Sequence, residues 1–417
     1  MRKLLLLITI TNLAVLSAPA ATPQESLQFY TQELSAFPAQ NTRATREYAA
    51  ALANGLETWL FQHASQPAAQ DALLMQTRLW LRAQENGSAL VSLFKLRRLF
   101  PTTDSKAFAP LLTQALDGLQ ADSRPDATQF FKEASSAQDI TVREAETLYV
   151  FSKLAGRSFY PAAVQAFESF FKRNPSYSGN NEVELWYGDL HRINGNYLAA
   201  IAQYKKADAL YPDSPYKAAS IRLIGDIYAD NLKDTESALQ MYTQVLREFP
   251  DSTETGIVYK HMAILDENNK QYDSALINYD KAIELLGTAP AAYETYRGKA
   301  DVYIKTKNYN EAYTLLHKTA VLFKANPEES SEALQAAAKV AKKQLQDPQK
   351  YIQSLEKSLV LLPTAPTNPA TMYNLGIAYE QNMQPANAKE VYRKLILRYP
   401  TDKYASKAQK QLTRLAK

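Results

Sequence analysis

The stretch LWYGDLHRINGNYLAAIAQYKKADALYPDSPY, residues 185–216, reads as two helices joined by a turn and closed by a second break. Apolar residues recur at helical spacing on both sides of Asn194-Gly195-Asn196, a sequence that favours a turn. Tyr211-Pro212-Asp213 then ends the second helix, because a proline cannot continue it. The stretch predicts one helical hairpin.

The same hairpin pattern recurs along the chain at a nearly constant interval. Pro175 and Pro212 are 37 residues apart, Pro212 and Pro250 are 38 apart, and Pro363 and Pro400 are again 37 apart. In each period a small residue lies in the first helix and an aromatic residue in the second. The small residues are Gly188, Gly225, Ala263, Ala300 and Gly376, and the tyrosines are Tyr204, Tyr242, Tyr279 and Tyr392. A fixed period of roughly 20–50 residues indicates a solenoid of stacked repeats.

Composition agrees with a helical repeat protein and excludes several functions. The 417 residues are 46% hydrophobic and contain only 12 glycines, which favours helices over a turn-rich β-fold. The absence of cysteine excludes disulfides, thiolate metal sites and a lipid-modified cysteine. A net charge of +4 gives no electrostatic case for nucleic acid.

The first twenty residues have the organisation of a signal peptide. Arg2-Lys3 forms a basic start, residues 4–16 an apolar core, and Ala18-Pro19-Ala20 an A-x-A cleavage site. The core is shorter than the roughly 20 residues of a membrane span. We therefore expect an exported protein, in the bacterial periplasm or secreted, with no transmembrane segment in the mature chain. An uncleaved anchor is the alternative.

The repeat residues resemble the tetratricopeptide repeat. The best match places Leu375-Gly376, Tyr379, Ala388, Tyr392 and Pro400 at the family's positions without a gap. The resemblance implies an all-α fold, a right-handed superhelical solenoid of helical hairpins with a capping helix at the C-terminus. The long exit loops look like those of bacterial envelope repeat proteins, among them BamD-like and Tol-Pal-associated periplasmic proteins.

The repeats divide the chain into three parts. Residues 1–20 are the signal peptide, 21–140 a lobe of divergent helical hairpins, and 141–417 the repeat array with its lysine-rich cap. Thr141-Val142-Arg143-Glu144 fits a capping box that restarts the array. In the repeat that follows Asp213, one residue is inserted near 231–234.

The resemblance also implies a binding groove lined by the first helix of each repeat, at the family's fifth and ninth positions. The predicted partner-binding residues are Asp189, Arg222, Asp226, Lys260, Arg297 and Asp301. Alternating charges can hold an extended peptide. The alternative is structural, since Arg222–Asp226 and Arg297–Asp301 are i, i+4 pairs on one helix.

Catalytic and cofactor motifs are missing from the sequence, and the four histidines are spread over different repeats. We therefore expect a non-enzymatic scaffold that binds a protein or peptide, with no cofactor, no metal and no nucleic acid. Two alternatives stay open. One is a saccharide-binding export factor, and the other is a peptidoglycan-cleaving enzyme with a helical superhelix.

Overall fold

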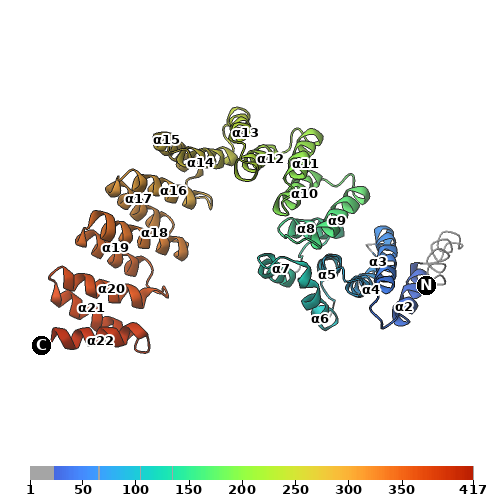
Figure 1. Cartoon of the computed structure of the whole chain (residues 1–417), viewed down its shortest axis with the longest axis horizontal. Coiled ribbons are helices and arrows are strands. Elements are labelled where there is room, and N and C mark those ends of the chain that lie inside the picture. The colour runs from blue at the N-terminus through green and yellow to red at the C-terminus, as the bar shows by residue number, and fades with distance from the viewer. Residues whose placement is uncertain (1–22, 64–65, 104, 134, 417) are drawn as a thin grey trace. The chain divides into compact units, whose positions relative to one another are not determined.

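The computed structural model describes residues 23–63, 66–103, 105–133 and 135–416. All regular secondary structure in these ranges is helical (Figure 1), which confirms the all-α fold. The predicted signal peptide lies outside the described residues. The chain divides into two compact units, Met1–Ile227 and Tyr228–Lys417. This division is not a test of the boundary predicted at residue 140, which concerns where the regular repeats begin and stays a prediction.

The helices of the first unit are α2 (Pro23–Ser35), α3 (Arg43–His63), α4 (Ala69–Arg82), α5 (Asn86–Leu99), α6 (Ser105–Ala115), the short 3-10 helix η1 (Leu116–Gly118), α7 (Ser123–Lys132), α8 (Ile140–Phe151), α9 (Phe159–Arg173), α10 (Asn180–Ile193), α11 (Tyr197–Leu210) and α12 (Lys217–Asp226). A π-helical segment, η2 (Ile227–Leu232), spans the division between the units.

The helices of the second unit are α13 (Thr235–Glu248), α14 (Thr253–Asn268), α15 (Tyr272–Leu286), α16 (Ala292–Lys305), α17 (Tyr309–Leu322), α18 (Pro327–Val340), the π-helical η3 (Ala341–Leu345), α19 (Pro348–Leu361), α20 (Asn368–Gln381), α21 (Pro385–Arg398) and α22 (Lys403–Leu415). Each packs against the next in chain order, as expected for stacked hairpins (Figure 1).

The hairpin predicted from residues 185–216 is α10 and α11. The turn between them contains Gly195 in the left-handed region, with φ +78°. The same turn recurs after every later first helix, but there a side-chain-bearing residue takes the left-handed conformation. These residues are Lys233, Lys270, Lys307, Gln346 and Met383. Their spacing confirms the period that the prolines predict.

In the hairpins α10–α11 and α20–α21, a glycine of the first helix lets a buried tyrosine of the second helix approach. A Cβ on Gly188 would lie 2.2 Å from the ring of Tyr204, and one on Gly376 would lie 2.2 Å from the ring of Tyr392. Both rings are fully buried, as Tyr242 and Tyr279 nearly are. The hydroxyls of Tyr204, Tyr279 and Tyr392 donate to carboxylates of the first helix, as Tyr392 does to Glu380 at 2.6 Å. The predicted packing role of the tyrosines is confirmed.

The inserted residue predicted near 231–234 is absorbed by helix geometry rather than by a longer loop. The last turns before Lys233 form the π-helix η2, which holds an extra residue within a continuous helix. The η3 segment does the same before Gln346. The repeat spacing therefore lengthens at these two places while the hairpin is preserved.

The helix that restarts the array has a different cap from the predicted one. α8 begins one residue before Thr141, and Asp139 is its N-cap. The Asp139 carboxylate accepts from the backbone N–H groups of Thr141 at 2.7 Å and Val142 at 3.1 Å. Those bonds lower the pKa of Asp139. Glu144 does not close a capping box and instead forms an ion pair with Arg173 on α9.

The N-terminal hairpin α4–α5 packs on the start of the repeat array, although it precedes the regularly spaced repeats. α5 packs against both α8 and α9, while α6 and η1 pack beside α4 and α5. Phe131 of α7 contacts Phe94 of α5 and Phe108 of α6, edge to face. One cluster of buried side chains runs from Leu27 to Leu190 and therefore crosses residue 140.

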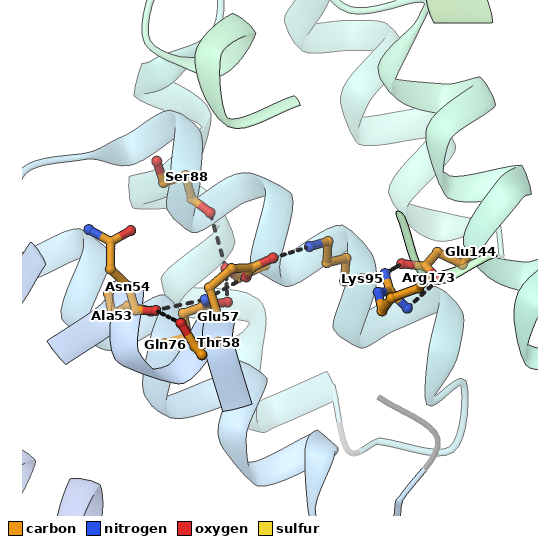
Figure 2. Close-up of polar contacts among 10 residues, drawn as sticks. Ala53, Asn54, Glu57, Thr58, Gln76, Ser88, Lys95, Glu144 and Arg173 are labelled. Atoms are coloured by element: carbon orange, nitrogen blue, oxygen red, sulfur yellow. Dashed lines mark hydrogen bonds and ion pairs between the residues drawn. The ribbon is translucent and has the colours of Figure 1, made fainter. Parts of the chain in front are cut away.

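Two largely buried ion pairs lie within this N-terminal core. Figure 2 shows Lys95 of α5 pointing at Glu57 of α3, with an Nζ to Oε1 distance of 3.1 Å. Gln76 of α4 donates to Glu57 at 2.8 Å. Together with Glu144 and Arg173, the Glu57–Lys95 pair lines a cavity of about 20 Å³. Burial opposes ionisation of Glu57, but Lys95, Gln76 and Arg173 outweigh it and lower the pKa of Glu57.

Candidate functional site

The six predicted partner-binding residues all lie on first helices. One of them, Asp189, forms hydrogen bonds and ion pairs within the protein. It is buried on α10 and accepts from the Tyr204 hydroxyl at 2.8 Å. Arg192 lies 3.0 Å and Lys153 lies 3.5 Å from the same carboxylate. These partners account for the charge of Asp189, so its predicted contact with a partner stays a prediction.

Arg222 and Asp226 form the i, i+4 ion pair that was the structural alternative. Both side chains lie on α12 and are 15% exposed. A pair this shielded fixes the two side chains against each other, although such pairs on a helix stabilise it by only about 0.2–0.5 kcal/mol. The i, i+4 ion pair is therefore present, and the predicted contact of these two residues with a partner stays a prediction.

Arg297 bridges two neighbouring first helices. It lies on α16, and its guanidinium is 2.7 Å from Glu332 on α18 and 4.0 Å from Glu294. Asp301 is exposed one turn further along α16, and Lys260 is half-buried on α14. Polar groups of successive first helices therefore do meet on one side of the second unit.

Beyond Arg297 on that side lies a recess that we call the lysine pocket, of about 350 Å³. Its rim contains Lys339 of α18 and Lys342 and Lys343 of η3, with Thr371 and Asn374 of α20 opposite. Among the described residues, none of the three lysines has a carboxylate within ion-pair distance. Lys342 lies over the ring of Tyr351 at 5.0 Å, and no carboxylate of the described residues neutralises any of the three ammonium groups on the rim.

The first unit has a recess of opposite charge, which we call the Trp186 pocket, of about 620 Å³. Glu146 and Tyr149 of α8 line it together with Trp186 of α10. The aromatic rings of Tyr149 and Trp186 meet edge to face, with centroids 5.2 Å apart. Neither pocket was predicted, because each combines residues from separate repeats.

In the described part of the chain, no group of three or more histidine, aspartate or glutamate side chains is placed to hold a metal ion. None of the helices described there is both long and apolar enough to cross a bilayer.

His317 makes the stability of the second unit depend on pH. Its ring packs on Tyr313 and its Nε2 lies 2.9 Å from the Ser354 hydroxyl. Burial, with a smaller effect of Lys357, lowers the pKa of His317 to about 4. An unfolded histidine titrates near ~6.5, so between these values the unfolded chain binds the extra proton and the free energy of unfolding falls as pH is lowered.

We therefore expect the melting temperature to fall less in His317→Gln than in the wild type when the pH is lowered from about 7 to about 5. Thermal melts of both proteins at the two pH values test this. Parallel losses in the two proteins would show that His317 does not carry the effect.

Comparison with known families agrees with this architecture. One tetratricopeptide repeat model matches residues 153–215, and a second matches 221–252 and 370–402. The chain carries tetratricopeptide repeats. The matched ranges contain the hairpin α10–α11 and all but the first two residues of α20–α21, the hairpins with the clearest repeat pattern.

Solved repeat structures are similar at low identity. A tetratricopeptide repeat protein from Parabacteroides merdae has 16% identity and a TM-score of 0.36, covering 66% of this chain and 99% of that one. The C-terminal part of a repeat protein from Cytophaga hutchinsonii has 15% identity and a TM-score of 0.41, covering 64% and 98%. The pilF product of Pseudomonas aeruginosa has 14% identity and a TM-score of 0.36, covering 55% and 97%. No curated protein matches the chain significantly.

Proposed function

We propose that this protein is a non-enzymatic scaffold of the bacterial periplasm, or a secreted one, that binds a protein or peptide partner within a cell-envelope complex. Tetratricopeptide repeats support protein–protein interaction in general. Export is supported by the basic, apolar and A-x-A segments of residues 1–20. The BamD-like and Tol-Pal-associated resemblance of the exit loops supports the envelope.

The observation that carries the binding proposal is the lysine pocket. Some lysines elsewhere in the second unit are paired with carboxylates, as Lys299 is with Asp280 and Lys305 is with Glu267. Lys339, Lys342 and Lys343 face a recess bounded by two first helices and have no such partner among the described residues. Unpaired cations gathered in a recess attract acidic groups of a partner and favour its encounter.

The test is crosslinking in cells followed by identification of the captured protein. We expect the wild type to capture one protein reproducibly. Reversing the charge of Lys339, Lys342 and Lys343 to glutamate should reduce that capture about tenfold. The matched control reverses three exposed lysines outside the pocket. These are Lys318, Lys324 and Lys410.

Equal capture by the two triple variants would contradict a role for the lysine pocket, and no reproducible capture by the wild type would contradict the scaffold proposal. Release of muropeptides by the purified protein would replace the scaffold with the enzyme alternative. The saccharide alternative has little support from the tyrosines, because Tyr204, Tyr242, Tyr279 and Tyr392 are buried in the hairpins.

A further inference from the structure

The Trp186 pocket lies in the first unit, where four segments distant in the sequence meet. Arg98 comes from the end of α5 and Glu133 from the residue after α7. Glu146 belongs to α8, and Glu182 and Trp186 belong to α10. α8 and α10 are successive first helices in contact. The pocket therefore lies between two successive first helices, and the end of α5 and the segment that follows α7 add walls to it.

The charge of the pocket is negative because three carboxylates face one guanidinium. Arg98 is 7% exposed, and its nearest carboxylate oxygen, on Glu146, is 3.9 Å away, beyond hydrogen-bond distance. Glu133 accepts only a neutral bond from Gln129, at 3.1 Å. Arg98 can balance one of the three carboxylates. Two negative charges are left for a ligand.

Two cations near the pocket, Lys153 and Arg97, make other interactions. Lys153 extends over the ring of Tyr149 at 4.9 Å, but its ammonium group pairs with Asp189 at 3.5 Å. Arg97 donates to the carbonyl oxygens of Pro101 at 2.9 Å and Lys132 at 3.4 Å. The excess of negative charge is therefore not neutralised by these neighbours.

Arg98 gives a second, independent sign that the pocket is incomplete without a ligand. Its Nε is buried and has no hydrogen-bond acceptor in the structure. A buried donor without an acceptor costs about 1–3 kcal/mol, and each such group in a folded protein calls for an explanation.

The aromatic wall selects the kind of cation. Tyr149 is 40% exposed, and it meets Trp186 edge to face. Aromatic faces attract cations and also pack against methylene groups. A lysine or arginine side chain combines a charged head with an apolar stem, so it matches both the carboxylates and the rings. A bare metal ion would leave the rings without a contact.

We propose that the Trp186 pocket binds a lysine or arginine side chain of a partner peptide, with Glu146 and Glu182 pairing its charge and Tyr149 and Trp186 holding its stem. The inference rests on the proposed function only in taking a protein segment as the ligand. It adds the chemistry that this segment presents to the first unit.

The test measures binding of short dye-labelled peptides to the purified full chain by fluorescence anisotropy at low ionic strength. One peptide carries two lysines among alanines, and the other two carry norleucine or glutamate at those positions. We expect the lysine peptide to bind about tenfold more tightly than the norleucine peptide, and the glutamate peptide to bind most weakly.

The variant Glu146→Gln with Glu182→Gln keeps the shape of the pocket and removes two charges. We expect it to lose the tenfold preference for lysine, whereas Glu284→Gln with Glu311→Gln, on exposed sites of the second unit, should retain it. Trp186→Phe should weaken lysine-peptide binding by about threefold. Thermal melts check that each variant is folded. If the double glutamine variant does not fold, the Trp186→Phe variant tests the inference on its own.

Equal binding of the lysine and norleucine peptides, or an unchanged preference in the Glu146 and Glu182 variant, would overturn the inference. These outcomes differ from a failure of the scaffold proposal, which is decided by capture of a partner in cells. A chain that captures its partner but shows no lysine preference would keep the proposed function and lose the inference.

Discussion

Replacing Gly376 with valine is expected to lower the free energy of unfolding of the second unit by about 2–3 kcal/mol. The added Cβ would meet the ring of Tyr392 at 2.2 Å. That ring is fully buried and its hydroxyl is bonded to Glu380, so it has no open space into which to move. Helices α20 and α21 must therefore separate, and α22, which packs on both, loses its support.

The measurement is a thermal melt combined with amide hydrogen exchange over residues 369–416. We expect a lower melting temperature and faster exchange in α20, α21 and α22. The control Ala386→Val places the same isopropyl side chain at an exposed site of α21, and should change stability by only about 0.5 kcal/mol. If the two variants melted alike, the assigned contact between small residue and tyrosine would be incorrect.

Replacing Lys95 with alanine is expected to destabilise the first unit by about 3 kcal/mol or more. The Lys95 and Glu57 side chains are only 10% and 19% exposed, so the variant leaves a mostly buried carboxylate without its cation (Figure 2). Gln76 still donates to Glu57, but one neutral hydrogen bond does not replace a buried charge. We expect the loss to shrink when Glu57 is also made glutamine.

Urea unfolding of the single and double variants measures this effect. Lys172→Ala, at an exposed site on α9, is the control and should be nearly neutral. A Lys95→Ala protein as stable as that control would show that the buried pair contributes nothing. The same series tests pH dependence, because the lowered pKa of Glu57 means that stability is lost as pH falls through its folded value.

The repeats could be predicted from the sequence because their determinants are local. Pro212, Gly188 and Tyr204 each act within one hairpin, through a helix stop, a close approach and a filled gap. The same three features recur in later periods, so a single hairpin fixed the pattern for the whole array. The inserted residue near 231–234 was also visible, although its accommodation in a π-helix was not.

Some turn conformations and side-chain contacts depend on residues of neighbouring helices, which sequence spacing does not reveal. Lys270 and Met383 take a left-handed conformation that a sequence reader assigns to glycine, because the hairpin geometry overrides their preference. Asp189 was predicted to face a partner, yet it binds Tyr204 from the second helix. Neither its burial nor its partners follow from its position in the repeat.

The two pockets were missed for a similar reason. Arg98 and Glu182 are far apart in the sequence, and they line one pocket because α5 packs on α8, which in turn contacts α10. The lysine pocket had one visible signal, the close spacing of Lys339, Lys342 and Lys343. A run of lysines is also typical of a solvated helix face, and only the structure shows that these three lysines line a recess.

Partner binding through the first helices is tested most directly by photo-crosslinking from defined positions in cells. A photoreactive amino acid is placed at exposed Gln335 or Asn374 on first helices, or at Val360 or Leu397 on second helices, where exposed apolar side chains offer a rival surface. We predict a crosslinked protein adduct from the first-helix positions and none from the second-helix positions. Adducts from Val360 or Leu397 alone would contradict partner binding through the first helices.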